Sequence, residues 1–279
     1  MATFVLVHGS FHAAWNWHRL TPLLEQAGHV GVAVDLPGHG RDPTPRRRVT
    51  LASCVDGVVA AVQAAAEPVV LVAHSRSGIV ISEVAERLPD RVAGLVYLAA
   101  YLVPSGRSMM DYAVLDPGSL VVQNIVAPPP RRVLGWMVRW LKLAPARWAA
   151  SRLLPARFAT HALARRAYRE ALYHDCPPEI VRLAEALLEP EPNAPGFTPL
   201  ALTEARFGRV PKVYVRCARD RAVTPALQDR MVQDTPCDAV LTLDTGHSPF
   251  FADPPGLAAA LERSLAAFER SDQARCNIR

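Results

Sequence analysis

The segment VVLVAHSRSG, residues 69–78, constrains the fold more than any other part of this sequence. An apolar run typical of a β-strand ends at a small residue, and Ser75 follows on a tight turn that opens a helical pattern. This is the pattern of a nucleophile elbow, a strand-to-helix turn that exposes a serine hydroxyl. In the usual G-x-S-x-G motif two glycines flank the turn, whereas here Ala73 and Ser77 replace them and Gly78 follows directly. Taken alone, these ten residues fit equally well an ordinary turn whose serine caps a helix.

An acid and a histidine follow downstream in the order that a serine nucleophile of this type requires. KVYVRC, residues 212–217, predicts a buried strand with Asp220 in the loop after it. A shorter strand over 239–243 runs into a Gly-His turn that carries His247. Because ligands of open α/β sheets bind beyond the carboxyl ends of the strands, we expect Ser75, Asp220 and His247 to meet there as a catalytic triad.

Each of these residues also has a plainer interpretation. The chain has nine histidines, and most histidines are surface or structural residues, but His247 follows a predicted strand at the right point in chain order. Asp220 lies between two arginines and could be a solvated turn charge. Asp244 is a second carboxylate near the carboxyl ends of the same strands. We favour Asp220 because it follows the preceding strand, as the motif order requires.

The start of the chain predicts a second half for the site. FVLVHGS forms a strand that breaks at His8-Gly9, where glycine lets the backbone turn beneath the serine. We expect the backbone N–H groups of Ser10 and Arg76 to form an oxyanion hole. The Arg76 side chain opposes the helix dipole, so it needs a partner. It could hold a substrate carboxylate or phenolate, or form a salt bridge with a helix acid such as Glu83 or with a cap residue.

Several segments carry a family resemblance: VHGSFHAAWNWHRLTPLLEQAGH, the elbow, YLAAYLVP, YHDCPPE, VYVRCARDRAVTPALQDRMV and TGHSPFF. They resemble the α/β-hydrolase branch that contains plant methylesterases, hydroxynitrile lyases and many bacterial esterases. The resemblance covers nearly the whole chain and is weakest from about 120 to 170. It implies that Ser75 is the nucleophile, Asp220 the acid and His247 the base, with oxyanion amides from Ser10 and Arg76.

Two departures from that family pattern bear on the reaction. Members that cleave cyanohydrins carry a threonine where this chain has Gly9, and a lysine where Ser248 follows the catalytic histidine. Without that lysine a departing cyanide lacks a positive partner, so the resemblance implies ester hydrolysis. We place Gly9, His12, Trp136 and Ser248 in the substrate pocket.

Periodicity predicts a six-stranded, mostly parallel sheet flanked by helices, and the resemblance implies that this is an α/β-hydrolase fold. Strands are expected near 3–8, 30–35, 69–73, 92–98, 212–217 and 239–243, and helices near 17–27, 51–65, 77–88, 225–234 and 255–269. The alternation stops between Pro104 and about Phe207, which predicts a helical cap inserted between the fourth and fifth strands. We therefore divide the chain into a hydrolase core, 1–104 and 209–279, and a cap, 105–208.

The cap concentrates positive charge. Within residues 131–170 ten basic residues face a single acid, Glu170, giving a local charge of +9 in a chain of net charge +5. The basic residues are Arg131, Arg132, Arg139, Lys142, Arg147, Arg152, Arg157, Arg165, Arg166 and Arg169. An apolar stripe at helical spacing, Val133, Trp136, Met137, Trp140 and Leu141, predicts a helix that packs over the pocket with a solvated basic face. That face could instead bind an anionic membrane surface, an acidic protein or a second subunit. Nucleic acid is disfavoured, because no recognised binding motif accompanies the charge.

Two shorter segments of the cap are also informative. The proline-rich EPEPNAPGFTP, residues 189–199, predicts a loop that returns the chain to the core and could act as a hinge. Asp175-Cys176-Pro177-Pro178-Glu179 predicts a helix start, which makes Cys176 a structural residue rather than a nucleophile.

Composition is that of one ordinary globular domain. The 279 residues are 50% hydrophobic and 20% charged, which suits one well-buried domain. Five cysteines without paired or metal-ligand spacing indicate reduced thiols, hence a cytoplasmic protein with no metal site. The first strand begins at Thr3 and no apolar run reaches membrane-spanning length, so we expect neither a signal peptide nor a membrane helix.

The sequence thus predicts a cofactor-independent serine hydrolase that cleaves a carboxylic ester through an acyl-enzyme. The resemblance and the apolar cap imply a small to medium, partly aromatic or polyketide-like ester. Two alternatives stay open because one fold supports several activities. The first is a tailoring enzyme of secondary metabolism that catalyses cyclisation, decarboxylation or elimination. The second is a non-catalytic ligand receptor. A hydroxynitrile lyase is less favoured.

Overall fold

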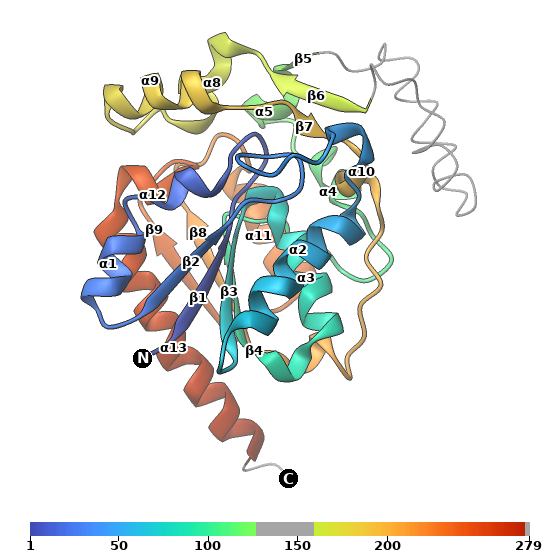
Figure 1. Cartoon of the computed structure of the whole chain (residues 1–279), viewed down its shortest axis with the longest axis vertical. Coiled ribbons are helices and arrows are strands. Elements are labelled where there is room, and N and C mark those ends of the chain that lie inside the picture. Colours follow the sequence, from blue (N-terminus) through green and yellow to red (C-terminus); the bar gives the residue numbers. More distant parts are fainter. Residues whose placement is uncertain (127–158, 277–279) are drawn as a thin grey trace.

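The computed structural model describes residues 1–126 and 159–276, in which strands and helices alternate around a central six-stranded sheet (Figure 1). The strand order is β2-β1-β3-β4-β8-β9, and every neighbouring pair is parallel. These strands are β1 Thr3–Val7, β2 Val30–Val34, β3 Val69–His74, β4 Val92–Leu98, β8 Lys212–Cys217 and β9 Ala239–Leu243. All six predicted strands are confirmed to within one residue at each end.

Helices cover both faces of this sheet. They are α1 Thr21–Gln26, α2 Leu51–Ala64, α3 Gly78–Arg87, α11 Pro225–Asp234, α12 Pro249–Ala252 and α13 Pro254–Cys276. Two predicted helices differ. The one near 17–27 divides into a 3-10 turn, Ala14–Trp17, and α1, and the one near 255–269 continues to Cys276. Proline occupies the first position of both α11 and α13, where its missing N–H and fixed φ suit a helix start.

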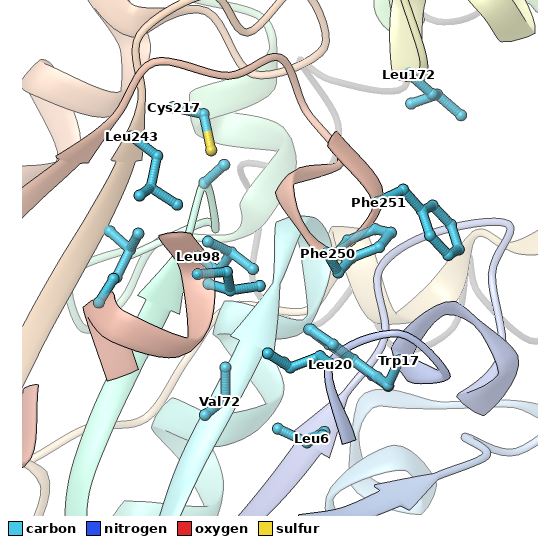
Figure 2. Close-up of a cluster of buried hydrophobic side chains, with 14 of the residues drawn as sticks. Leu6, Trp17, Leu20, Val72, Leu98, Leu172, Cys217, Leu243, Phe250 and Phe251 are labelled. Carbon is cyan, nitrogen blue, oxygen red and sulfur yellow. The ribbon is translucent and has the colours of Figure 1, made fainter. Parts of the chain in front are cut away.

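The strands are apolar at nearly every position because each face of the sheet packs on its own core. In β1, Phe4 and Leu6 belong to the core beneath α1 and α13, whereas Val5 and Val7 belong to the core beneath α2 and α3. Figure 2 shows the first of these cores, in which Phe250 and Phe251 of α12 lie above Val72 of β3 and Leu6 of β1. Such two-sided burial fixes the register of the strands, and with it the height at which their carboxyl ends finish.

The cap lies over those carboxyl ends (Figure 1). Its described elements are α4 Met109–Ala113, α5 Leu120–Gln123, β5 Ile125–Val126, β6 Thr160–Leu163, α8 Tyr168–Leu172, α9 Pro178–Leu187, β7 Glu191–Pro192 and α10 Ala194–Phe197. An antiparallel sheet, β5-β6-β7, stands among the helices that the sequence predicts. Strands of two to four residues are too short to produce a readable alternation, which is why the sequence does not reveal them.

The proline-rich segment 189–199 is more ordered than the expected loop, because it contains β7 and α10. Pro192 lies on an edge strand and Pro195 in the first turn of a helix, two places where a missing N–H is tolerated.

Some predictions about the cap concern residues outside the described part of the chain. They include the apolar stripe with Trp136 and the seven basic residues between positions 131 and 157. A membrane, an acidic protein or a second subunit as partner of the basic face therefore stays a prediction.

Two findings bear on the cellular setting. No helix in residues 1–126 and 159–276 is long and apolar enough to span a membrane. The described cysteines Cys54, Cys176, Cys217 and Cys237 are free thiols. A cytoplasmic location stays a prediction.

Candidate active site

Ser75 occupies a strained turn between β3 and α3. It opens a 3-10 turn, Ser75–Ser77, and has a φ of +55°, in the left-handed region that few non-glycine residues adopt. A serine in this conformation between a buried strand and a helix has the geometry of a nucleophile elbow. The N–H of Tyr101 donates to the Ser75 carbonyl at 2.9 Å and anchors the turn to the chain after β4.

The elbow tolerates Ser77 in place of the second motif glycine because the tightest approach lies one residue later. The Ser77 hydroxyl donates to the carbonyl of His8, which ties the elbow to the end of β1. A Cβ on Gly78 would lie 2.4 Å from the carbonyl oxygen of Tyr101. Position 78, and not position 77, is therefore the one that requires glycine.

His247 and Asp220 form a buried pair at the ends of β9 and β8. The Nδ1–H of His247 donates to Oδ2 of Asp220 at 2.7 Å, and both side chains are at most 3% exposed. The other carboxylate oxygen accepts the N–H groups of Ala222 and Val223 at 2.7 and 3.0 Å. This arrangement fixes the carboxylate, holds the imidazole in one tautomer and leaves Nε2 with a free lone pair.

The second carboxylate considered from the sequence, Asp244, lies elsewhere. Its side chain is 87% exposed and pairs with the Nε of Arg219 at 3.1 Å. The structure thus brings Asp220, and not Asp244, to His247.

His74, which the sequence analysis passed over, links the serine to the histidine. Its Nε2–H donates to the backbone carbonyl of His247 at 2.8 Å, and the two rings lie 4.4 Å apart between centroids. Burial, followed by the charge of His247, lowers the pKa of His74 well below its ordinary value. A neutral, tethered ring next to Ser75 fixes the distance between the elbow and the loop of His247.

The turn after β1 packs directly against the elbow. A Cβ on Gly9 would lie 2.7 Å from Nδ1 of His74 and 2.8 Å from Cβ of Ser75. Within the described residues no hydrogen bond engages the backbone N–H of Ser10. The N–H of Arg76, in the first turn of the helical segment, has no intrahelical acceptor. The backbone N–H groups of Ser10 and Arg76 thus stay the predicted donors of an oxyanion hole.

His12 lies behind this turn. Its Nδ1–H donates to the Ser10 carbonyl at 2.7 Å, and its Nε2 accepts the Tyr173 hydroxyl at 2.5 Å. The ring is 1% exposed, and burial lowers its pKa to about 4. Both ring nitrogens are engaged within the protein. His12 therefore supports the backbone at Ser10, and the structure does not assign it a substrate contact.

The remaining predicted pocket residues have different settings. Ser248 is fully buried next to His247, and its hydroxyl has no hydrogen-bond partner among the described residues. Trp136 lies outside those residues.

The Arg76 side chain has a cap residue as its partner, one of the two alternatives left open by the sequence. Its Nη1 lies 2.7 Å from Oε1 of Glu191, and both side chains are at most 2% exposed. Glu83 is engaged elsewhere, by the N–H of Ala201 at 2.8 Å. A positive charge in the first turn of a helix is unfavourable, so the position of Arg76 predicted that its side chain has a partner. Nothing in EPEPN identified Glu191, because a glutamate between prolines is usually a solvated loop residue.

No group of three or more His, Cys, Asp or Glu side chains that could hold a metal ion is found in residues 1–126 and 159–276.

Comparison with known proteins shows the family of this chain. The sequence model of the Alpha/beta hydrolase family matches residues 4–260. Methylesterase 7 of Arabidopsis thaliana is 31% identical over 267 residues, covering 92% of this chain and 94% of that protein. Methyl jasmonate esterase 1 of Vitis vinifera is 28% identical over 290 residues, covering 95% of this chain and 97% of that protein. The crystal structure of the methylesterase MES16 from Arabidopsis superposes with a TM-score of 0.74 at 25% identity, covering 95% of this chain and 99% of that one.

Proposed function

Because this chain belongs to the α/β-hydrolase family, in the branch that includes plant methylesterases, we propose that it is a serine esterase that works through an acyl-enzyme. The observation that supports this most is the 2.7 Å bond between His247 and Asp220, held by His74 beside the strained Ser75. A base held in one tautomer close to a serine hydroxyl is the arrangement that activates a serine.

In the first half of the proposed reaction, Nε2 of His247 takes the proton of Ser75 as Oγ attacks the ester carbonyl. The carbonyl oxygen becomes an oxyanion, which accepts the N–H groups of Ser10 and Arg76. Asp220 stabilises the imidazolium and keeps its orientation. The C–O bond to the alcohol then breaks, and His247 gives its proton to the leaving oxygen.

In the second half, water replaces the alcohol. His247 takes a proton from the water as its oxygen attacks the acyl carbon, and the same two amides stabilise the second oxyanion. The bond to Ser75 then breaks, the serine regains its proton from His247, and the carboxylic acid departs. All atoms come from the ester, the water and the protein, so the reaction needs no cofactor.

We further propose that the substrate is the ester of a small alcohol, methyl esters being the first class to test. The support comes from the names of the relatives, two methylesterases and a methyl jasmonate esterase.

Two features speak against cyanohydrin cleavage. A threonine at position 9, expected in such enzymes, has no room beside His74 and Ser75, where even a Cβ would lie at 2.7 to 2.8 Å. At position 248 the buried serine offers no positive charge for a departing cyanide.

The test combines turnover with labelling. Native protein is assayed on a panel of p-nitrophenyl and methyl esters and labelled with a fluorophosphonate, with Ser75→Ala and Ser105→Ala as paired variants. We expect Ser75→Ala to lose labelling and about 10⁴- to 10⁶-fold in turnover. Ser105→Ala alters an exposed serine that accepts the N–H of Leu202, and should retain both properties.

Each other result has a meaning. If Ser75→Ala kept a tenth of native turnover, the proposed mechanism would be wrong. Labelling of Ser75 without turnover of any ester would instead favour a tailoring enzyme or a ligand receptor.

A further inference from the structure

A single buried carboxylate from the cap contacts both halves of the proposed oxyanion hole. Glu191, in β7, is completely buried. Its Oε2 accepts the N–H of Phe11 at 2.7 Å and lies 3.3 Å from Nε2 of His39, while its Oε1 lies 2.7 Å from Nη1 of Arg76. Phe11 directly follows Ser10, and Arg76 directly follows Ser75. Glu191 therefore touches the two positions that set the direction of the two proposed donors.

On the first side, Glu191 fixes the peptide unit next to the Ser10 donor. The peptide that joins Ser10 and Phe11 is held at both ends, since its C=O accepts His12 Nδ1–H and its N–H donates to Glu191. Phe11 has a φ of +68°, a left-handed conformation that a bulky residue adopts only when its surroundings impose it. The Phe11 carbonyl in turn accepts the N–H of Glu189 at 2.9 Å. The cap segment 189–191 thus holds a strained turn in place from above.

On the second side, Glu191 holds the side chain of the residue that carries the other donor. The Arg76–Glu191 contact is a buried ion pair and not an aligned hydrogen bond, so charge attraction is its main component. Burial opposes ionisation of Glu191, yet the positive charge of Arg76, followed by the influence of the neighbouring His39, lowers the pKa of this carboxyl well below its ordinary value. The carboxylate therefore stays charged through the pH range in which an esterase works.

We propose that Glu191 is a positioning residue that sets the separation and direction of the Ser10 and Arg76 N–H groups, so that the cap completes the oxyanion hole. This inference rests on the proposed function. An oxyanion hole works only when its donors already point at the position of the developing charge. A misplacement of about 1 Å can lower a rate about 10²-fold.

The test uses Glu191→Gln, which preserves shape and one acceptor but removes the charge. We expect kcat to fall about 10²-fold while KM changes less than about threefold, because the hole acts on the transition state. The rate of fluorophosphonate labelling should fall in parallel. Glu83→Gln is the matched control, since it removes an equal charge from a carboxylate that also accepts a backbone N–H, that of Ala201, away from the hole, and it should leave both rates unchanged.

A pair of ketones separates positioning from general damage. With an aryl trifluoromethyl ketone, Ser75 Oγ adds to the carbonyl carbon and the serine proton passes to His247. The carbonyl oxygen then becomes an oxyanion that binds in the hole. The matching methyl ketone binds without that addition. In Glu191→Gln, Ki for the trifluoromethyl ketone should rise as far as kcat/KM falls, whereas Ki for the methyl ketone should change less than about threefold.

A double variant protects the test against misfolding. In Glu191→Gln/Arg76→Met no unpaired buried charge remains, so thermal stability should recover while kcat stays at least about tenfold low. Recovery of kcat together with stability would show that Glu191 only neutralises Arg76, and would overturn the proposal. So would a Glu191→Gln kcat within threefold of native, or equal weakening of both ketones. If native protein neither turned over esters nor labelled on Ser75, the proposed function would fail first and this inference with it.

Discussion

Acidification should destabilise this protein through the buried imidazole of His12. Burial lowers the pKa of His12 to about 4 in the folded state, against 6.5 for the exposed group. Between these values the unfolded chain binds a proton that the folded chain excludes, so the free energy of unfolding must fall as pH falls from about 6.5 toward 4. His8 and His74, whose pKa values burial also lowers, act in the same direction.

The size of the effect follows from the two pKa values. Within the interval, one excluded proton changes the free energy of unfolding by about 1.4 kcal/mol per pH unit. Integrated from pH 7 to pH 5, the contribution of His12 alone is about 2 kcal/mol. That is a large fraction of the 5–15 kcal/mol typical of a folded domain.

The assay is urea unfolding at pH 7 and pH 5 for native protein, His12→Gln and Tyr173→Phe. His12→Gln removes the titrating group, so its destabilisation relative to native should be about 2 kcal/mol smaller at pH 5 than at pH 7. Tyr173→Phe removes the hydroxyl bonded to Nε2 but leaves the buried ring, so it should cost the same, about 1–2 kcal/mol, at both pH values. Equal destabilisation by His12→Gln at both pH values would refute the reasoning.

Three further predictions concern the site. Asp220→Asn should lower kcat about 10⁴-fold, because the imidazole loses its tautomer, whereas Asp244→Asn should stay within about threefold; steady-state kinetics would expose a reversed order. Gly78→Ala should lower the free energy of unfolding by about 1–3 kcal/mol, since the new methyl overlaps the Tyr101 carbonyl, and an unchanged melting temperature would contradict that packing. With this protein, mandelonitrile should release cyanide no faster than in buffer alone, because Ser248 provides no positive charge. Measured cyanide release that depends on Ser75 would contradict this prediction.

The sequence predicted the core of the fold well because its signals are local. The central strands β3 and β8 are runs of residues buried on both faces, and the edge strand β9 is a short apolar run. Such runs end where the chain turns, so the ends of β3, β8 and β9 predicted that Ser75, Asp220 and His247 lie near one edge of the sheet. Chain order was enough to prefer Asp220 over Asp244. The packing of Gly9 against Ser75 could also be predicted from the sequence, since a glycine directly after a strand indicates a tight turn.

What the sequence did not reveal depends on contacts between distant segments. Glu191 meets Phe11 across 180 positions, and Tyr173 meets His12 across 161, with no periodic pattern at either end. The short strands of the cap sheet are likewise defined by their pairing and not by their composition. The partners of such residues can be identified only from the folded structure, in which the cap packs on the core.

The Arg76–Glu191 pair also bears on how caps change during the divergence of this family. Arg76 belongs to the core, but the carboxylate that neutralises it arrives with the insertion. A chimera that received a relative's cap without that carboxylate would bury an unpaired guanidinium, at a cost of about 3–5 kcal/mol. Replacing the cap therefore demands a simultaneous change at position 76, and this requirement for two coordinated changes makes the insertion hard to exchange as a module.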